Sequence, residues 1–208
     1  MMGWDYHLSW YGLLVLTYLL LQVILAHAEY CRQRRSPRPP VRARVTVIVP
    51  TYNEPLDVLQ ECVASIFAQT YEGFLETFVI DDGSDPPYRF NRSDFPVQDT
   101  SQRTLAIFAL PYNQGKRRAQ YAGFQKSTGE YIITVDSDTR LAPDAINNLV
   151  ALFAQPRVGA ITGAVRVDPR PNLLAWLIDL RYWSAFHQER AAQSFFGVMS
   201  RQRMYLRR

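Results

Sequence analysis

The chain has 208 residues, of which 48% are hydrophobic and 20% are charged, and its formal net charge is +4. This balance excludes a wholly disordered chain, which needs low hydrophobicity and high net charge, and the 10 Gly and 13 Pro exclude a collagen-like or low-complexity sequence. The two cysteines, Cys31 and Cys62, exclude a disulfide-rich scaffold and a metal site made of four cysteines.

The first expected element is an apolar segment over residues 11–28, with no charged side chain except His27 when protonated. Its length lies at the short end of the roughly 17–25 residues that a membrane-spanning helix needs. The alternatives are a buried helix and a cleaved signal peptide, because Ala26-His27-Ala28 resembles a cleavage site. A signal peptide needs positive charge before its apolar core, and residues 1–10 contain no Lys or Arg. We therefore expect a short tail (1–10) and an uncleaved transmembrane helix (11–28).

A basic linker is expected next, over residues 29–44. Pro37, Pro39 and Pro40 favour a stiff, extended backbone there. Because cytoplasmic flanks of membrane helices are rich in Lys and Arg, we expect the rest of the chain on the cytoplasmic side of the plasma or inner membrane. We interpret the basic residues as a topology and lipid-surface signal rather than as a nucleic-acid-binding patch; they are Arg32, Arg34, Arg35, Arg38, Arg42 and Arg44.

Strand-like and helix-like segments alternate through the remainder, residues 45–208. This alternation predicts an α/β fold with a mostly parallel sheet flanked by helices. The first strand is expected to end at Pro50, and residues 83–103 are expected to form a loop. The expected strands are 45–49, 75–80, 105–110, 131–135 and 158–167, and the expected helices are 59–67, 116–126, 143–153 and 173–195.

Polar residues follow three expected strands, at the edge where such sheets bind their ligands. Asp136 and Asp138 stand two residues apart, so both carboxylates would face one side if the backbone stays extended. Such a pair can hold a divalent cation, since Mg²⁺ takes one or two carboxylates together with substrate phosphates. The alternative is a turn in which an Asp caps a helix.

The other two polar strand ends are PTYNE (50–54) and DDGS (81–84). Tyr52 is a candidate for stacking on a base, with packing in the core as the alternative. Asn53 is a candidate cap for the helix that follows. The three strand ends together strengthen the prediction of a metal and ligand site at this edge of the sheet.

Basic residues open the expected helix over 116–126, directly after Gly115. The free N–H groups and dipole of a helix N-terminus favour a bound anion. Lys116, Arg117 and Arg118 add charges that can pair with phosphate oxygens. The alternative is a solvated basic face. The helix dipole favours anions, and not basic side chains, at this end of the helix. Next to a cation site, a bound diphosphate therefore explains the basic cluster better than a solvated face does.

Two other enzyme classes fit the motifs poorly. A haloacid-dehalogenase-like phosphatase also carries a DxD motif at a strand end, but that motif wants Thr or Val where this chain has Arg140. A dinucleotide-dependent dehydrogenase is disfavoured because no G-x-G-x-x-G motif follows a strand.

Five ordered motifs resemble those of the processive family-two glycosyltransferases with a GT-A fold. The most similar branch comprises the hyaluronan synthases and their chitin synthase and nodulation-type chitooligosaccharide synthase relatives. The resemblance covers residues 45–197. The motifs are PTYNE (50–54), VIDDGS (79–84), GKRRA (115–119), VDSDT (135–139) and RYWSAFHQERAAQSFFG (181–197).

The resemblance implies a membrane enzyme that transfers GlcNAc and/or GlcA from a UDP-sugar to a growing polysaccharide, with inversion and with Mg²⁺ or Mn²⁺. It implies that Tyr52 and Glu54 contact the uridine and that Asp82 binds the uracil or ribose side. It further implies that Lys116 meets the diphosphate and that Asp136 contacts the nucleotide sugar. Asp138 would hold the metal.

The chain departs from the family pattern over residues 198–208, which contain no Gly or Pro. Relatives continue there with a Ser-Gly-Pro-containing stretch, followed by an acidic base and a Gln-x-x-Arg-Trp motif. No residue here occupies the base position, so the catalytic residue stays unassigned and the acceptor half is expected to be incomplete. The alternative to a complete enzyme is therefore a membrane-anchored UDP-sugar-binding fragment or a partner protein, with a partner chain supplying the acceptor half.

Overall fold

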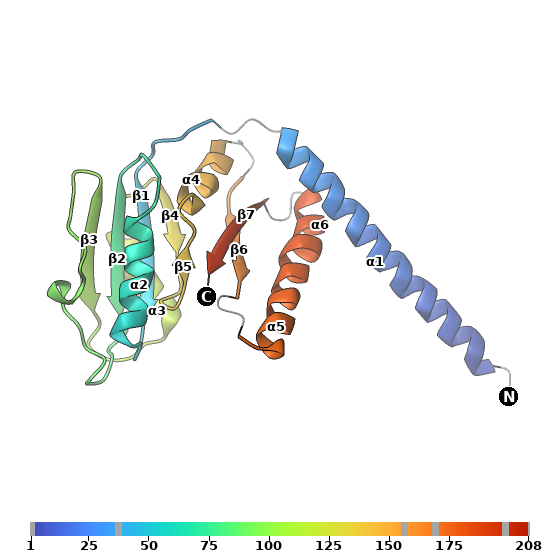
Figure 1. Ribbon diagram of the computed structural model, residues 1–208, viewed down its shortest axis with the longest axis horizontal. Coiled ribbons are helices and arrows are strands. Elements are labelled where there is room, and N and C mark those ends of the chain that lie inside the picture. The colour runs from blue at the N-terminus through green and yellow to red at the C-terminus, as the bar shows by residue number, and fades with distance from the viewer. Residues whose placement is uncertain (1–2, 36–38, 155–157, 168–170, 197–199, 208) are drawn as a thin grey trace.

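The N-terminal helix α1 (Gly3–Arg35) extends away from the rest of the chain (Figure 1). The computed structural model describes residues 3–35, 39–154, 158–167, 171–196 and 200–207. The stretch Ser9–Arg35 is long and apolar enough to cross a membrane by length and composition, and 6% of its most apolar window is buried. The helix continues past residue 28, into the range where we expected the linker, because no proline interrupts the chain before Pro37.

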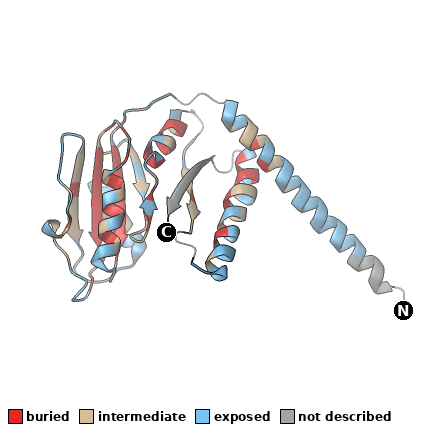
Figure 2. Cartoon of the chain, in the orientation of Figure 1, coloured by how far each residue is buried: buried red, intermediate tan, exposed pale blue. Residues whose placement is uncertain are grey.

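The central sheet is parallel, as the alternation of elements predicts. Its strand order is β3-β2-β1-β4, so β1 and β2 lie in the middle. Figure 2 shows burial concentrated on these two strands, in which every residue is buried. The strands are β1 (Val45–Thr51), β2 (Leu75–Asp81), β3 (Arg103–Ala109) and β4 (Tyr131–Thr134).

Helices cover both faces of this sheet, because alternate residues of a strand point to opposite sides. Val45, Val47 and Val49 join one core cluster with α2 (Leu56–Phe67) and α4 (Ala145–Val150). Ile48 lies on the other face, against α3 (Lys116–Lys126). Short 3-10 turns occur at η1 (Arg92–Asp94), in the loop expected after β2, and at η2 (Ala151–Ala154).

The first strand runs through Pro50 to Thr51, so the expectation that it ends at the proline is wrong. The N–H of Val45 and the carbonyl of Thr51 both bond on the β2 side, whereas the carbonyl of Ile48 bonds on the β4 side. By alternation the nitrogen of Pro50 points toward β4, whose pairing with β1 ends at Ile48 and Thr134. The missing N–H therefore removes no ladder bond.

The expected fifth strand belongs to a separate small sheet and not to the central one. β6 (Ile161–Arg166) pairs in parallel with β7 (Ser200–Arg207), which pairs antiparallel with β5 (Arg140–Leu141). The expected helix over 173–195 is confirmed as α5 (Leu173–Ser184), a π-helical turn η3 (Ala185–Glu189) and α6 (Arg190–Phe195). Of the divergent tail, residues 198, 199 and 208 lie outside the described residues.

The buried carboxylate of Glu76 connects the elements at the amino-terminal end of the sheet. Thr46 donates its hydroxyl to Glu76 at 2.5 Å, and Thr128 donates its N–H at 2.6 Å and its hydroxyl at 2.8 Å. Burial by itself would raise the pKa of Glu76, but the hydrogen bonds from Thr46 and Thr128 outweigh it and hold the pKa below its ordinary value. One side chain thus joins β1, β2 and the segment before β4.

We expect Glu76→Gln to lower the free energy of unfolding at pH 7 by about 1–3 kcal/mol, because an amide cannot accept all three hydrogen bonds. Since the pKa of Glu76 is lowered in the folded state, its contribution is present above the unfolded pKa and is lost as the pH falls through the folded pKa. The stability of the wild type should therefore fall below about pH 4.5 more steeply than that of the variant. Denaturant titrations in detergent at several pH values measure this.

Glu72→Gln is the matched control, because Glu72 forms an exposed ion pair with Arg42. Such pairs contribute about 0–1 kcal/mol. Parallel pH profiles for wild type and Glu76→Gln would contradict the role of Glu76.

Candidate functional site

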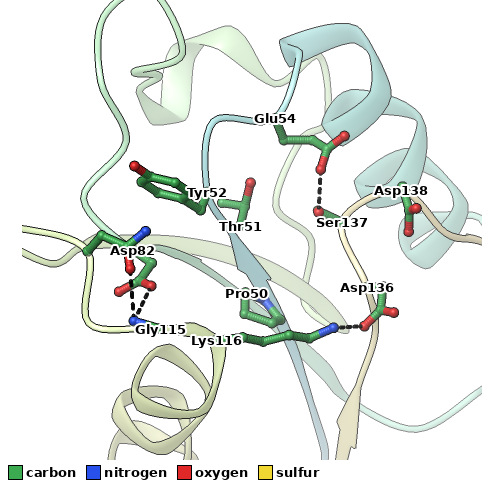
Figure 3. A pocket seen from close by; sticks show the side chains of 11 residues that line it. Pro50, Thr51, Tyr52, Glu54, Asp82, Gly115, Lys116, Asp136, Ser137 and Asp138 are labelled. Carbon is green, nitrogen blue, oxygen red and sulfur yellow. Dashed lines mark hydrogen bonds and ion pairs between the residues drawn. The ribbon is translucent and has the colours of Figure 1, made fainter.

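A pocket of about 350 Å³ lies at the carboxyl ends of β1, β2 and β4 (Figure 3). The six residues to which the family resemblance gives a donor or metal role all line it: Tyr52, Glu54, Asp82, Lys116, Asp136 and Asp138. Three further residues also line it: Thr51 and Ser137, which lie inside the quoted motifs but were given no role, and Asn113, which sequence reasoning missed. The hydroxyl of Thr51 is buried and has no hydrogen-bond partner among the described residues. A bound ligand or water would satisfy it.

The loops after β1 and β2 are held together by Asn53 and Ser84. The N–H of Asn53 donates to the Ser84 hydroxyl at 2.9 Å, and the Asn53 side chain accepts the N–H of Asp85 at 2.8 Å. The expectation that Asn53 caps the next helix is therefore wrong: α2 begins at Leu56 with no side-chain cap. Asn53 instead has a positive φ of 49°, which Asn tolerates better than most residues.

Tyr52 lies at the pocket and outside the core, with 43% of its surface exposed. The alternative of core packing is thus wrong for this ring. In Figure 3 the ring lies on the same side of the pocket as Asp82. Its exposed aromatic surface is available to a ligand.

Asp82 connects β2 to the start of α3. Its carboxylate accepts the N–H of Gln114 at 2.9 Å and the N–H of Gly115 at 2.7 Å. Each carboxylate oxygen accepts one of these bonds and keeps a further lone pair for a ligand. The chain's own carboxylate therefore occupies the backbone donors just before the helix, where we expected donors open to an anion.

Lys116 is the member of the basic cluster that lines the pocket, whereas Arg117 and Arg118 do not line it. Its ammonium group forms an ion pair with Asp136 at 2.5 Å, across the pocket from β4 (Figure 3). Both side chains are about half exposed. Solvent screens such a pair, so a ligand that brings a stronger anion can replace it at modest cost.

Asp136 and Asp138 are placed by a turn, so the assumption of an extended backbone is wrong. The N–H of Thr139 donates to the carbonyl of Asp136 at 3.0 Å, and β5 rather than a helix follows. This turn also presents Ser137, whose hydroxyl donates to Glu54 at 2.9 Å. The β1 loop and the DxD segment are therefore linked across the pocket.

Cys62 lies beneath this turn, with its sulfur 3.6 Å from the carbonyl oxygen of Asp136. Burial, together with the negative charge of Asp138, raises the pKa of Cys62 to about 12. The thiol therefore stays protonated near neutral pH.

The pocket has a strong excess of negative charge. Four carboxylates and one ammonium group line it: Glu54, Asp82, Asp136, Asp138 and Lys116. Among the described residues, no three His, Cys, Asp or Glu side chains gather closely enough to hold a metal by themselves. One or two carboxylates with substrate phosphates is the arrangement typical of Mg²⁺ sites, and the DxD turn fits it.

Comparisons with known proteins agree with this geometry. A family model described as glycosyl transferase family 2 matches residues 46–208. Similar curated proteins named N-acetylglucosaminyltransferase come from Sinorhizobium fredii (strain NBRC 101917 / NGR234), 41% identical over 159 residues, and Rhizobium meliloti (strain 1021), 37% identical over 202 residues. These matches cover 74% and 92% of this chain but 37% and 45% of the relatives. The chain thus spans less than half the length of either.

Among solved structures, the chain is similar to a mannosyltransferase from Pyrobaculum calidifontis in complex with GDP-Man and Mn²⁺. The two are 27% identical with a TM-score of 0.50, over 71% of this chain and 47% of that chain.

Two glycines, Gly115 in the pocket lining and Gly83 directly after the pocket residue Asp82, test how closely the surrounding loops pack. A Cβ at Gly83, where φ is +72°, would lie 2.4 Å from the backbone of Tyr112. At Gly115, where φ is +91°, a Cβ would meet nothing within 4 Å. With ψ at 150°, Gly115 lies in a backbone region that is essentially restricted to glycine. We expect Gly115→Ala to cost about 1–3 kcal/mol of folding free energy from the backbone alone, and Gly83→Ala to cost about 1–3 kcal/mol more through the collision. Denaturant unfolding of both variants measures this; equal losses would contradict the close approach.

Proposed function

The chain belongs to glycosyl transferase family 2, and we propose that it binds a UDP-sugar and transfers GlcNAc and/or GlcA to a growing polysaccharide of the hyaluronan or chitin type. The relatives named N-acetylglucosaminyltransferase favour GlcNAc as the sugar. The observation that most strongly supports this proposal is that an exposed aromatic ring, a lysine and a DxD turn line one pocket at the edge of the sheet.

We assign the two ends of the donor to opposite sides of this pocket. Tyr52 and Glu54 contact the uridine, and Asp82 binds its uracil or ribose through the lone pairs that Gln114 and Gly115 leave open. Lys116 meets the diphosphate and Asp136 contacts the sugar. Their mutual ion pair lies where the diphosphate and the sugar would join. These roles concern the donor, and we assign no residue as the base for the acceptor hydroxyl.

The charge of the pocket supports a requirement for Mg²⁺ or Mn²⁺. A diphosphate entering a site with four carboxylates and one lysine would be repelled unless a cation accompanied it. Asp138 would hold this metal, which would neutralise the charge that develops on the diphosphate leaving group. The mannosyltransferase neighbour is described with Mn²⁺.

We propose that α1 anchors the chain in the plasma or inner membrane and leaves the sheet in the cytoplasm. The apolar stretch of α1 and the arginines at its carboxyl end support this orientation. In this proposal the tail is 1–10, the spanning segment 11–28, the linker 29–44 and the glycosyltransferase domain 45–208. The polymer acceptor would meet the donor at the open side of the pocket.

The decisive experiment measures UDP-GlcNAc and UDP-GlcA turnover by the purified chain in detergent with Mg²⁺ or Mn²⁺, together with calorimetric UDP binding. Turnover abolished by Asp138→Asn would support the enzyme. Metal-dependent UDP binding without turnover would favour the alternative, a donor-binding chain that takes its acceptor half from a partner chain. No metal-dependent binding would overturn both.

We expect Lys116→Met to weaken UDP binding roughly 10- to 100-fold, because a hydrogen bond to a charged group contributes about 1.5–3 kcal/mol. The matched control is Lys126→Met at the other end of the same helix, where the ammonium lies over the Phe108 ring, 4.6 Å from its centroid. Calorimetry in Mn²⁺ should show wild-type affinity for the control. Equal affinities for the two variants would remove Lys116 from the diphosphate site.

We expect Tyr52→Ala to weaken binding of UDP by about 1–3 kcal/mol, the range for stacking of a base on an aromatic ring. Tyr52→Phe keeps the ring and should bind as the wild type does. Tyr121→Ala, on the exposed side of α3, controls for loss of a surface aromatic. If Phe fails as badly as Ala, the hydroxyl and not the ring carries the contact.

A further inference from the structure

A hydrogen bond across the pocket joins the loop after β1 to the DxD turn. Ser137 stands between Asp136 and Asp138, and its hydroxyl donates to the carboxylate of Glu54 at 2.9 Å (Figure 3). The two partners are 83 residues apart in the sequence. The bond therefore connects the side of the pocket to which we assign the uridine with the side to which we assign the metal.

Helix α2 holds the same turn from below. The thiol of Cys62 donates to the carbonyl of Asp136 at 3.6 Å, and the hydroxyl of Ser65 accepts the N–H of Leu141 at 3.0 Å. Residues three apart lie on one side of a helix, so both contacts come from the same face of α2. These bonds fix the backbone on either side of the two aspartates, and the Ser137 hydroxyl adds a contact on the pocket side.

Three carboxylates lie near the Ser137 hydroxyl: Glu54, Asp136 and Asp138. Together with burial, which is the largest cause, all three raise the pKa of the Cys62 thiol beneath the turn. Without a donor beside it, the carboxylate of Glu54 would be repelled by its neighbours and attracted to a cation at Asp138. Ser137 instead gives Glu54 a charge-assisted hydrogen bond at its observed position.

We propose that Ser137 is a positioning residue that makes the binding of uridine and the binding of the metal depend on each other. A metal at Asp138 orders the turn and with it the Ser137 hydroxyl, which keeps Glu54 directed at the uridine. Because such coupling is reciprocal, a bound uridine raises the affinity for the metal by the same factor. The inference rests on the proposed function, and in it Ser137 contacts neither the donor nor the metal.

The test compares uridine with UDP as ligands of the full chain in detergent, with and without saturating Mg²⁺ or Mn²⁺. Uridine has no phosphate that could contact the metal, so any effect of the metal on its affinity passes through the protein. We expect the metal to tighten uridine binding roughly fivefold for the wild type and by less than about twofold for Ser137→Ala. Calorimetric titrations with excess ligand measure the dissociation constants.

Two further variants separate coupling from a loss of structure. In a Glu54→Ala background, adding Ser137→Ala should change the effect of the metal no further, because the bond between the two side chains is already lost. Ser127→Ala removes a hydroxyl that donates to the carbonyl of Phe124 at the far end of α3, and it should keep the wild-type effect. A purely structural role of Ser137 would lower the free energy of unfolding and leave the effect of the metal unchanged.

An equal effect of the metal on uridine binding by the wild type and Ser137→Ala would overturn the inference, while metal-dependent UDP binding would leave the proposed function standing. A further loss on adding Ser137→Ala to Glu54→Ala would mean that Ser137 contacts the ligand or the metal directly, and this too overturns it. Absence of metal-dependent UDP binding by the wild type would overturn the proposed function and the inference together.

Discussion

The register of the parallel sheet is the constraint on which the site depends. Thr51 stands opposite Asp81, and Ile48 opposite Thr134, so three strands end within a few residues of one another. The chain leaves each strand at the same edge, which brings segments far apart in sequence around one pocket. A slip of one residue would turn every side chain of β1 to the other face and separate these loops.

Local hydrogen bonds then turn this edge into a site. The end of β1 is tied to β2 through Asn53 and Ser84, and β2 is tied to α3 through Asp82. A hydrogen bond between Ser137 and Glu54 links the DxD turn to the loop after β1. Two of these three contacts involve a backbone N–H, so the shape of the pocket is set before any ligand arrives. Such preorganisation lowers the entropy that binding must overcome.

Much of this arrangement is predictable from the sequence, and the failures have physical causes. Strand and helix periods locate the central elements, and polar residues after buried strands identify Asp82 and Asp136. Local propensity does not predict contacts between segments that are distant in the sequence. Such contacts decide that the nitrogen of Pro50 faces a side with no strand to pair with, that a turn forms at Ser137, and that Asn53 bonds to a loop 31 residues away. Each depends on a neighbour supplied by the tertiary fold.

Helix α5 is a second case in which the sequence composition does not determine the structure. The sequence favours core packing for Trp176 and Trp183, because such residues are usually buried in water-soluble proteins, and it leaves an interfacial helix or a sugar-lining wall as the alternative. Asp179 overrides that preference: a carboxylate held by a bidentate arginine and a backbone N–H leaves the helix one stable orientation, with its apolar side outward. A buried pair of this kind adds little net stability but discriminates strongly between orientations, since rotating α5 would strand Arg166 without its partner. Hydrophobicity alone therefore does not decide which solvent a helix faces; the polar contact that fixes its other side does.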